Sequence, residues 1–345
     1  MSMLIRKFAL VVLAVAVVGA APAWAQQARS ITGDSAGGSQ NPFRGSTLVY
    51  EHQATAIGAL RSALPEWNPY YAHQLSIRPE WHPESFPLFL RARLSLTQEL
   101  TTSDDFNSAH EAVLSDMQVE AVAPGWTEPN SKIRVGGNLR LVVPLSKASW
   151  AQTLVTAVSP AMTLTRTFAV PKLAGPIVVG YNLRYSKNFN RSSTPVMDGP
   201  RIPCTDPDSA LCARLSHNGL RNASWSIAHG PLVVVSPIEP LSLTFSFTQF
   251  RSALYDLTPA EVATATGTVS LGDGNGVDAR WSNFALIDAT YTFTPEFSLA
   301  AGAYTFSSQL GTDGTYRNPI FNRFTSVYVD LLVDVERLTN RLLSK

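Results

Sequence analysis

WSNFALIDATYTFTPEFSLAAGAYTFSS, residues 281–308, consists of two alternating runs on either side of the short turn 294–296. In the first run Ile287 and Tyr291 share the apolar face, and Asp288 lies on the polar face. Alternation with period two around a short turn predicts an antiparallel hairpin. Each run has about a dozen residues, which is longer than the usual strand of a soluble domain, and about 9–11 tilted residues are needed to cross a bilayer. These residues therefore predict one hairpin of a transmembrane β-barrel.

Similar alternating runs recur along the chain after residue 46. They give twelve candidate strands, at 47–57, 70–78, 87–100, 115–123, 132–145, 153–168, 177–188, 222–236, 241–251, 281–294, 297–308 and 324–335. An even number of strands is usual for bacterial single-chain barrels. The predicted fold class is therefore all-β, a single antiparallel up-and-down transmembrane β-barrel of about twelve strands.

The connections between these strands fall into two alternating classes. The short class contains prolines and lies at 79–86, 124–131, 169–176, 236–240 and 294–296. The other class is mostly longer and more polar, as at 190–221 and 252–280. Short periplasmic turns that alternate with longer extracellular loops are typical of outer-membrane barrels. A capping pattern also predicts short helices at 258–261 and 108–111.

The N-terminal residues 1–25 predict a cleaved secretory signal peptide. Arg6 and Lys7 supply the positive charge, an apolar run follows, and Ala23, Trp24 and Ala25 form the cleavage site. Removal of Arg6 and Lys7 leaves 25 of the 27 basic residues, against 26 acidic residues. This balanced charge does not favour nucleic acid as a partner.

The mature chain is predicted to have three parts. Residues 26–46 are rich in Gly, Ser and Gln and predict a flexible periplasmic leader. Residues 47–335 form the barrel, and residues 336–345 form a periplasmic tail. Leu338 and Leu342 fall on one face of this tail.

Several predicted strands separate an oily face from a polar face. In 87–100, Leu90 and Leu94 alternate with Arg91 and Arg93. Because a charge that faces mid-bilayer lipid costs roughly 2–4 kcal/mol, the charged face is predicted to line the lumen. The predicted lumen-lining residues are Glu51, Arg78, Arg91, Arg93, Glu99, Glu120, Arg134, Arg140, Arg184, Asp288, Asp330 and Asp334.

The charges of this predicted lining allow two interpretations. They could line a water-filled path and select solutes, or they could pair into a plug that closes the barrel. Twelve strands lie between the eight-strand barrels, which side chains fill, and the open porins of 16–18 strands. The geometry favours a narrow solute path only slightly.

Tryptophans occur at the ends of predicted strands or in the connections. Trp67, Trp150, Trp225 and Trp281 fall toward the outer side, and Trp81 and Trp126 fall toward the periplasmic side. Aromatic rings of this kind prefer membrane interfaces, so these six residues are predicted to form two girdles.

The two cysteines, Cys204 and Cys212, lie in the predicted loop 190–221. In an oxidising compartment they predict a disulfide that closes part of this loop, with a metal site as the less favoured alternative. The six histidines show no ligand spacing, so no metal is predicted.

These features together resemble the bacterial outer-membrane β-barrel proteins. The resemblance is incomplete at the C-terminus, because members of that class commonly end on an aromatic residue and this chain continues past Val335. A local resemblance to outer-membrane phospholipase A rests on Leu215 to Gly219, LSHNG, although Ser216 precedes His217 here. That resemblance implies Ser216 or Ser224 as nucleophile, His217 as base, and Asn218 or Asn222 as the orienting group.

The sequence thus predicts an outer-membrane protein that acts as a narrow passive channel or transporter for small hydrophilic solutes. Alternatives are a closed structural or surface-interaction barrel and an outer-membrane lipid hydrolase. The expected partners are outer-membrane lipids and small polar solutes. Neither a cofactor nor an enzymatic activity is expected.

Overall fold

The computed structural model describes residues 41–56, 70–84, 87–101, 110–171, 173–198, 215–217, 221–256, 260–264, 267–271, 278–311 and 314–343. The first half contains β1 (Thr47–Thr55), β2 (Tyr71–Arg78), β3 (Glu80–Trp81), β4 (Phe89–Glu99), β5 (Ala112–Leu114), β6 (Met117–Thr127), β7 (Ile133–Val143), α3 (Lys147–Ala151) and β8 (Leu154–Phe168). The second half contains β9 (Ile177–Asn190), β10 (Val196–Asp198), β11 (Leu215–His217), β12 (Ala223–Ile238), β13 (Leu241–Leu254), β14 (Ala260–Thr264), β15 (Gly267–Leu271), β16 (Ala279–Thr292), β17 (Phe297–Ser308), β18 (Thr325–Asp334) and α4 (Val335–Leu343).

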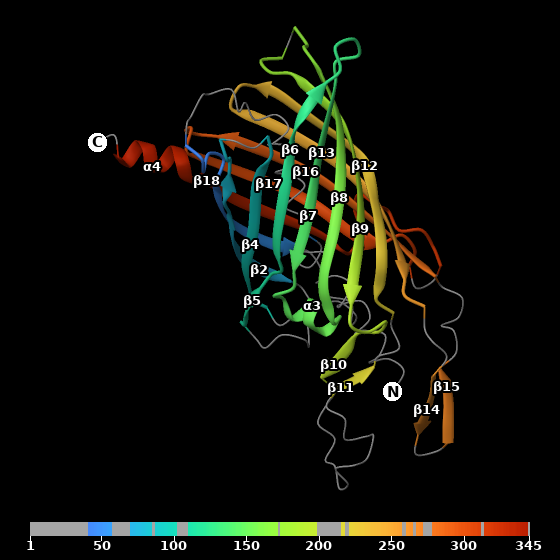
Figure 1. Cartoon of the computed structure of the whole chain (residues 1–345). Coiled ribbons are helices and arrows are strands. Elements are labelled where there is room, and N and C mark those ends of the chain that lie inside the picture. The colour runs from blue at the N-terminus through green and yellow to red at the C-terminus, as the bar shows by residue number, and fades with distance from the viewer. Residues whose placement is uncertain are drawn as a thin grey trace.

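Twelve of these strands close into one antiparallel barrel (Figure 1). Their order around the barrel is β1, β2, β4, β6, β7, β8, β9, β12, β13, β16, β17 and β18. The sheet closes because β1 pairs with both β2 and β18, and β2 in turn pairs with β4. Each strand of the barrel therefore lies beside its neighbours in the sequence, which confirms the predicted up-and-down barrel.

All twelve predicted strands are present, with bounds that differ by a few residues. The largest extension is at β6, which continues to Thr127 through a register shift between Ala123 and Trp126. The predicted alternation of connections is also confirmed. We call the end with the short connections the turn end; the longer connections, with α3, β10, β11, β14 and β15, lie at the loop end (Figure 1).

One local prediction differs from the structure, and one helix was not predicted. The helix predicted at 258–261 is wrong, because Ala260–Thr264 forms strand β14 and pairs with β15. Val262, Thr264 and Val269 are β-branched residues, which favour strands. This strand preference outweighs the capping pattern. Helix α3 was not predicted; the Ser146 side chain caps it by accepting a hydrogen bond from the Ser149 N–H.

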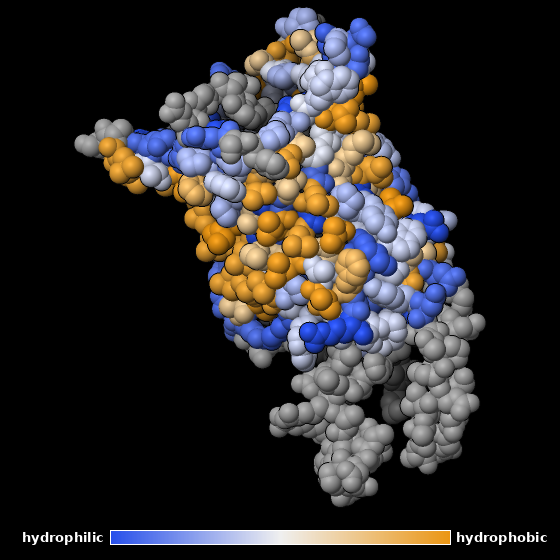
Figure 2. Space-filling model, in the orientation of Figure 1, coloured by the Kyte–Doolittle hydropathy of each residue, from blue (hydrophilic) through white to orange (hydrophobic). Residues whose placement is uncertain are grey.

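The outer wall of the barrel is apolar and exposed. In β18, for example, Val327, Val329 and Leu331 are exposed, whereas the alternate residues Tyr328 and Asp330 are buried. Figure 2 shows hydrophobic side chains gathered across the middle of the wall that faces the viewer. A closed barrel with an oily exterior and a polar interior is the arrangement that a membrane-spanning β-barrel requires. None of the described helices has the length and hydropathy needed to cross a membrane.

Gly230 and Pro231 interrupt the pairing of β12 with β13. The register is the same on both sides of the interruption, because His229 pairs with Gln249 and Leu232 pairs with Ser246. A Cβ at Gly230 would lie 1.8 Å from the backbone oxygen of Phe247. Only glycine allows the two backbones to approach this closely.

The chain ends of the barrel are fixed at the turn end. The Ser46 hydroxyl accepts a hydrogen bond of 3.0 Å from the Glu80 N–H, so the last residues of the predicted leader contact β3. Helix α4 follows β18 directly, where the tail was predicted (Figure 1). Its Arg341 lies 3.3 Å from Glu296 in the turn between β16 and β17. The rest of the predicted leader and the predicted signal peptide lie outside the described residues.

Candidate functional site

Most of the predicted lumen-lining residues lie inside the barrel. Eight of them are buried: Glu51, Arg78, Arg93, Glu99, Glu120, Arg184, Asp288 and Asp330. Arg91, Arg140 and Asp334 are half-buried. Arg134 is exposed near the turn end, although its position in β7 has the same parity as Arg140. Asp334, the last residue of β18, pairs with Arg337 of α4 at 3.5 Å rather than with the other inner charges.

A chain of ion pairs crosses the inner faces of β4, β6 and β7. Glu120 lies directly opposite Arg91 on one side and Arg140 on the other. Its carboxylate is 2.5 Å from Arg140 Nε and 3.8 Å from Arg91. Arg184, on β9, approaches the same carboxylate at 4.0 Å. Arg91 also pairs with Glu80 at 2.6 Å. One glutamate therefore neutralises several arginines, which stabilises buried charges that would otherwise be costly.

A second charged group lies where the first and last strands meet. Glu51 on β1 is directly opposite Asp330 on β18. Both interact electrostatically with Arg78 and Arg93 on the neighbouring strands β2 and β4. The closure of the barrel thus brings together acidic and basic residues that are far apart in the sequence.

Several polar atoms of this second group have no hydrogen-bond partner among the described residues. They are Glu51 Oε2, Arg78 Nε and Nη2, Arg93 Nη1 and Nη2, and Asp330 Oδ1. Buried polar atoms nearly always have a partner, and an unsatisfied charged atom is especially costly. The geometry of this group therefore suits water or a polar solute as the missing partner.

Across the barrel from the ion pairs of β4, β6 and β7, the interior carries a cluster of aromatic side chains. Phe284 and Leu286 on β16 pack with Tyr304 on β17 and Tyr328 on β18, and Phe250 and Phe306 extend this cluster. The Tyr328 hydroxyl donates a hydrogen bond of 2.7 Å to Asp288, and the Tyr304 hydroxyl donates one of 2.6 Å to Gln53. The alternation of the sequence did not predict this cluster. Its signal was the presence of large apolar and aromatic side chains, such as Phe284 and Leu286, on an otherwise polar face.

The described tryptophans lie at the two ends of the barrel. Trp81 and Trp126 are at the turn end, and Trp150, Trp225 and Trp281 are at the loop end. Trp67 lies outside the described residues. Cys204 and Cys212 also lie outside them, so their predicted disulfide stays a prediction.

The residues of the proposed hydrolase motif are only partly described. Asn218 lies outside the described residues, and only the backbone of Ser216 and His217 in β11 is described, paired with β10. Asn222 holds two loops together, because its side-chain amide donates to the carbonyl oxygens of Gln152 and Ser192. The Ser224 hydroxyl donates to the Ala253 carbonyl at 3.3 Å. Within the described part of the chain, no group of acidic, His or Cys side chains could hold a metal ion.

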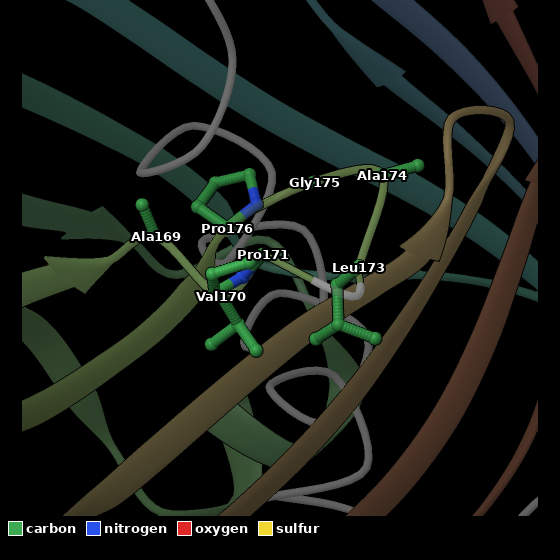
Figure 3. A pocket seen from close by; sticks show the side chains of 7 residues that line it. All are labelled: Ala169, Val170, Pro171, Leu173, Ala174, Gly175 and Pro176. Carbon is green, nitrogen blue, oxygen red and sulfur yellow. The ribbon is translucent and has the colours of Figure 1, made fainter.

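A shallow pocket of about 330 Å³ lies at the turn end, in the connection between β8 and β9 (Figure 3). It is lined by Ala169, Val170, Pro171, Leu173, Ala174, Gly175 and Pro176. All of these residues belong to one turn, and none carries a polar side chain. The pocket therefore offers no group that would orient a polar ligand.

The chain thus forms a closed β-barrel of twelve strands. Its exterior is apolar, and its interior carries charged groups and an aromatic cluster. No protein-family model matches the chain, and no curated protein matches it.

Solved structures of outer-membrane barrels are similar to this chain. One is an outer membrane channel from Pseudomonas putida F1, with a TM-score of 0.48, 10% identity, and coverage of 87% of this chain and 98% of that one. The NanC porin has a TM-score of 0.42, 10% identity, and coverage of 84% and 98%. LpxR from Salmonella typhimurium has a TM-score of 0.35, 10% identity, and coverage of 84% and 99%.

Proposed function

We propose that this protein is an outer-membrane β-barrel, exported with a cleaved signal peptide, that acts as a narrow passive channel for small hydrophilic solutes. The turn end faces the periplasm and the loop end faces the exterior, as the lengths of the connections favour. The exposed apolar outer wall supports the membrane location, since an oily barrel surface is stable only in contact with lipid.

One observation carries the channel proposal. Glu51, Arg78, Arg93 and Asp330 are buried on the inner wall, yet several of their polar atoms have no hydrogen-bond partner among the described residues. A plug made of paired charges would satisfy such atoms. A hydrated path supplies their partners and allows passing solutes to replace water.

The aromatic cluster on β16, β17 and β18 supports a narrow path. Its side chains occupy one side of the interior of a twelve-strand barrel, so less of the cross-section is left for solutes. Solutes would then pass beside this cluster, along the group in which Arg78 and Arg93 interact with Glu51 and Asp330.

Planar-bilayer recordings of the full chain test this proposal. We expect single channels of small conductance in KCl. In Arg93→Gln the reversal potential under a KCl gradient should shift toward cation selectivity, because a positive charge leaves the path. Arg166→Gln is the matched control; it changes the same charge on the outer wall and should leave selectivity unchanged.

Folded protein without any conductance would contradict the channel proposal. Folding is checked by heat-modifiable gel mobility of the same preparation. In that case the charges of Glu120, Arg91 and Arg140 would act as part of a plug, and a closed structural barrel would be the better interpretation.

A further inference from the structure

The outer wall of the barrel carries few charges, and all of them are basic. Among the outward-facing positions of the twelve described barrel strands, the charged residues are Arg166, Lys187 and Arg251. Arg166 lies near the turn end, whereas Lys187 and Arg251 lie near the loop end on strands that both pair with β12. A charge on this wall is costly unless it reaches the membrane interface, so two basic groups at one place need an explanation.

Lys187 and Arg251 lie within a set of aromatic rings at the loop end. The guanidinium carbon of Arg251 is 5.5 Å from the centre of the Trp281 ring and 5.9 Å from that of Trp225. Trp225 stacks on Tyr185 with 6.2 Å between ring centres. We call the residues Tyr185, Lys187, Trp225, Arg251, Tyr255 and Trp281 the basic-aromatic patch.

The strand registers place this patch on one continuous surface. Lys187 lies directly opposite Trp225, and Arg251 lies directly opposite Trp281. The Lys187 ammonium group is 5.6 Å from the centre of the Tyr255 ring. Cross-strand pairs of this kind share a face, so the patch covers β9, β12, β13 and β16 at the end away from α4 (Figure 1).

No carboxylate among the described residues forms an ion pair with Lys187 or Arg251. Aromatic faces attract both cations but do not neutralise them. The edge of a guanidinium that lies against rings keeps its N–H donors available for an anion, and phosphate suits their geometry. Trp225 and Trp281 hold these donors at the depth of the lipid headgroups.

The turn end provides a contrast. Arg166 is exposed there and contacts a single ring, that of Phe168, at 5.1 Å. It has no second basic residue beside it on the outer wall of the described strands. The two ends of the outer wall thus differ in positive charge, and the excess lies at the end that we assign to the outward-facing leaflet.

We propose that the basic-aromatic patch binds the phosphate groups of an anionic lipid in the leaflet at the loop end. The inference rests on the membrane location and orientation in the proposed function. Lys187 and Arg251 supply the positive charge, while the rings of Tyr185, Trp225 and Trp281 pack against the apolar part of the same lipid. Bound lipid would fix this side of the barrel in the membrane.

Lipid retention by the purified full chain tests the patch. The protein is folded in a detergent with an uncharged headgroup and titrated with bisphosphorylated lipid A, and bound lipid is measured by native mass spectrometry. The double variant Lys187→Gln/Arg251→Gln should bind at least about tenfold more weakly, because it loses both basic groups near the phosphates. Arg166→Gln is the matched control and should bind as the unchanged protein does. Phosphatidylcholine should not be retained.

Three results would overturn the inference: equal binding by the double variant, an equal loss in Arg166→Gln, or equal retention of phosphatidylcholine. If the double variant fails to fold, Lys187→Gln and Lys187→Arg replace it. Lys187→Arg keeps the charge and should lose less than about threefold, whereas Lys187→Gln should lose more. Equal binding by these two variants contradicts the assignment.

Channel recordings of the double variant separate this inference from the proposed function. Lys187 and Arg251 face outward, so their substitution should leave conductance unchanged. Protein that retains lipid A but does not conduct contradicts only the channel proposal. Protein that conducts but shows no selective lipid retention contradicts only the lipid site.

Discussion

On β4, β6, β7 and β9 the inner wall carries charged side chains that contact one another, whereas on β16, β17 and β18 it carries a cluster of aromatic side chains. The charged side is held by Glu120 among Arg91, Arg140 and Arg184. The aromatic side is held by the packing of Phe284, Tyr304 and Tyr328. One barrel therefore uses two kinds of interaction on the same inner surface.

This difference determines how each side should respond to change. Removal of a charge from the first side leaves other charges without a partner, at a cost that is mainly electrostatic. Removal of a ring from the second side leaves a void, at a cost that depends on how far the surroundings can collapse. Substitutions on the two sides can therefore test whether the two linings are really distinct.

The largest effect is expected for Glu120→Leu. It removes the carboxylate that pairs with the half-buried Arg140 and the buried Arg184, and breaking a buried ion pair in this way costs about 3–5 kcal/mol. Urea unfolding from lipid vesicles measures the loss. The double variant Glu120→Leu/Arg140→Leu should recover a large part of the stability, because the unpaired Arg140 charge is removed as well. Strictly additive losses would show that the two side chains do not interact.

Phe284→Ala tests the aromatic side. The Phe284 side chain is buried, and its truncation should cost about 3 kcal/mol through lost packing and a cavity. The same void widens the interior, so single-channel conductance should rise. Ile287→Ala on the outer face of the same strand is the matched control, because Ile287 is 53% exposed and faces lipid. An unchanged conductance in Phe284→Ala would mean that the ring does not border the solute path.

The two buried tyrosines on the aromatic side allow a finer comparison. Tyr328→Phe removes a hydrogen bond to the Asp288 carboxylate and should cost about 2 kcal/mol, while Tyr304→Phe removes one to the neutral Gln53 amide and should cost about 1 kcal/mol. Both changes keep the ring, so any loss reflects the hydroxyl. Urea unfolding of the two variants side by side measures the difference. A larger loss of stability in Tyr304→Phe than in Tyr328→Phe would mean that the hydrogen bond from Tyr328 to Asp288 adds little to stability.

The sequence predicted the strands and the inner face of each strand because both follow from the period of two. It also predicted the neighbours of each strand, since short turns make consecutive strands adjacent. The contacts among inner charges could not be predicted, because they depend on register. A one-residue slip of β6 against β4 would remove Glu120 from its place opposite Arg91, and the register shift near Trp126 is not visible in the alternation.

The aromatic cluster escaped prediction for a different reason. A polar interior is the rule for such barrels, so Phe284 and Leu286 read as exceptions rather than as a second lining. Their partners Tyr304 and Tyr328 lie on other strands and become neighbours only when β16, β17 and β18 pair. Phe284 and Leu286 can therefore be recognised as part of a cluster only when the strands that pair beside β16 are known.

The smallest predicted effect concerns the turn that joins β6 to β7 on the charged side. Hydrogen bonds from the Ser131 side chain and from the Ser131 and Asn130 N–H groups lower the pKa of Glu128 below its usual 4.5. A carboxylate with a lowered folded pKa contributes stability above its unfolded pKa and loses it as the pH falls through the folded pKa. The turn should therefore stay ordered at pH 4.5 and loosen only in stronger acid.

Nuclear magnetic resonance of the barrel in micelles measures this titration through the Asn130 and Ser131 amide signals. Their midpoint should lie below pH 4.5, and Glu128→Gln should abolish the transition. The amide of Gly175 in the turn between β8 and β9 is the control, because the described residues of that turn include no carboxylate that could titrate. A midpoint at or above pH 4.5 would mean that the hydrogen bonds from Asn130 and Ser131 to Glu128 do not persist. The register of β6 against β7 would then depend on the ion pairs of the charged side and not on this turn.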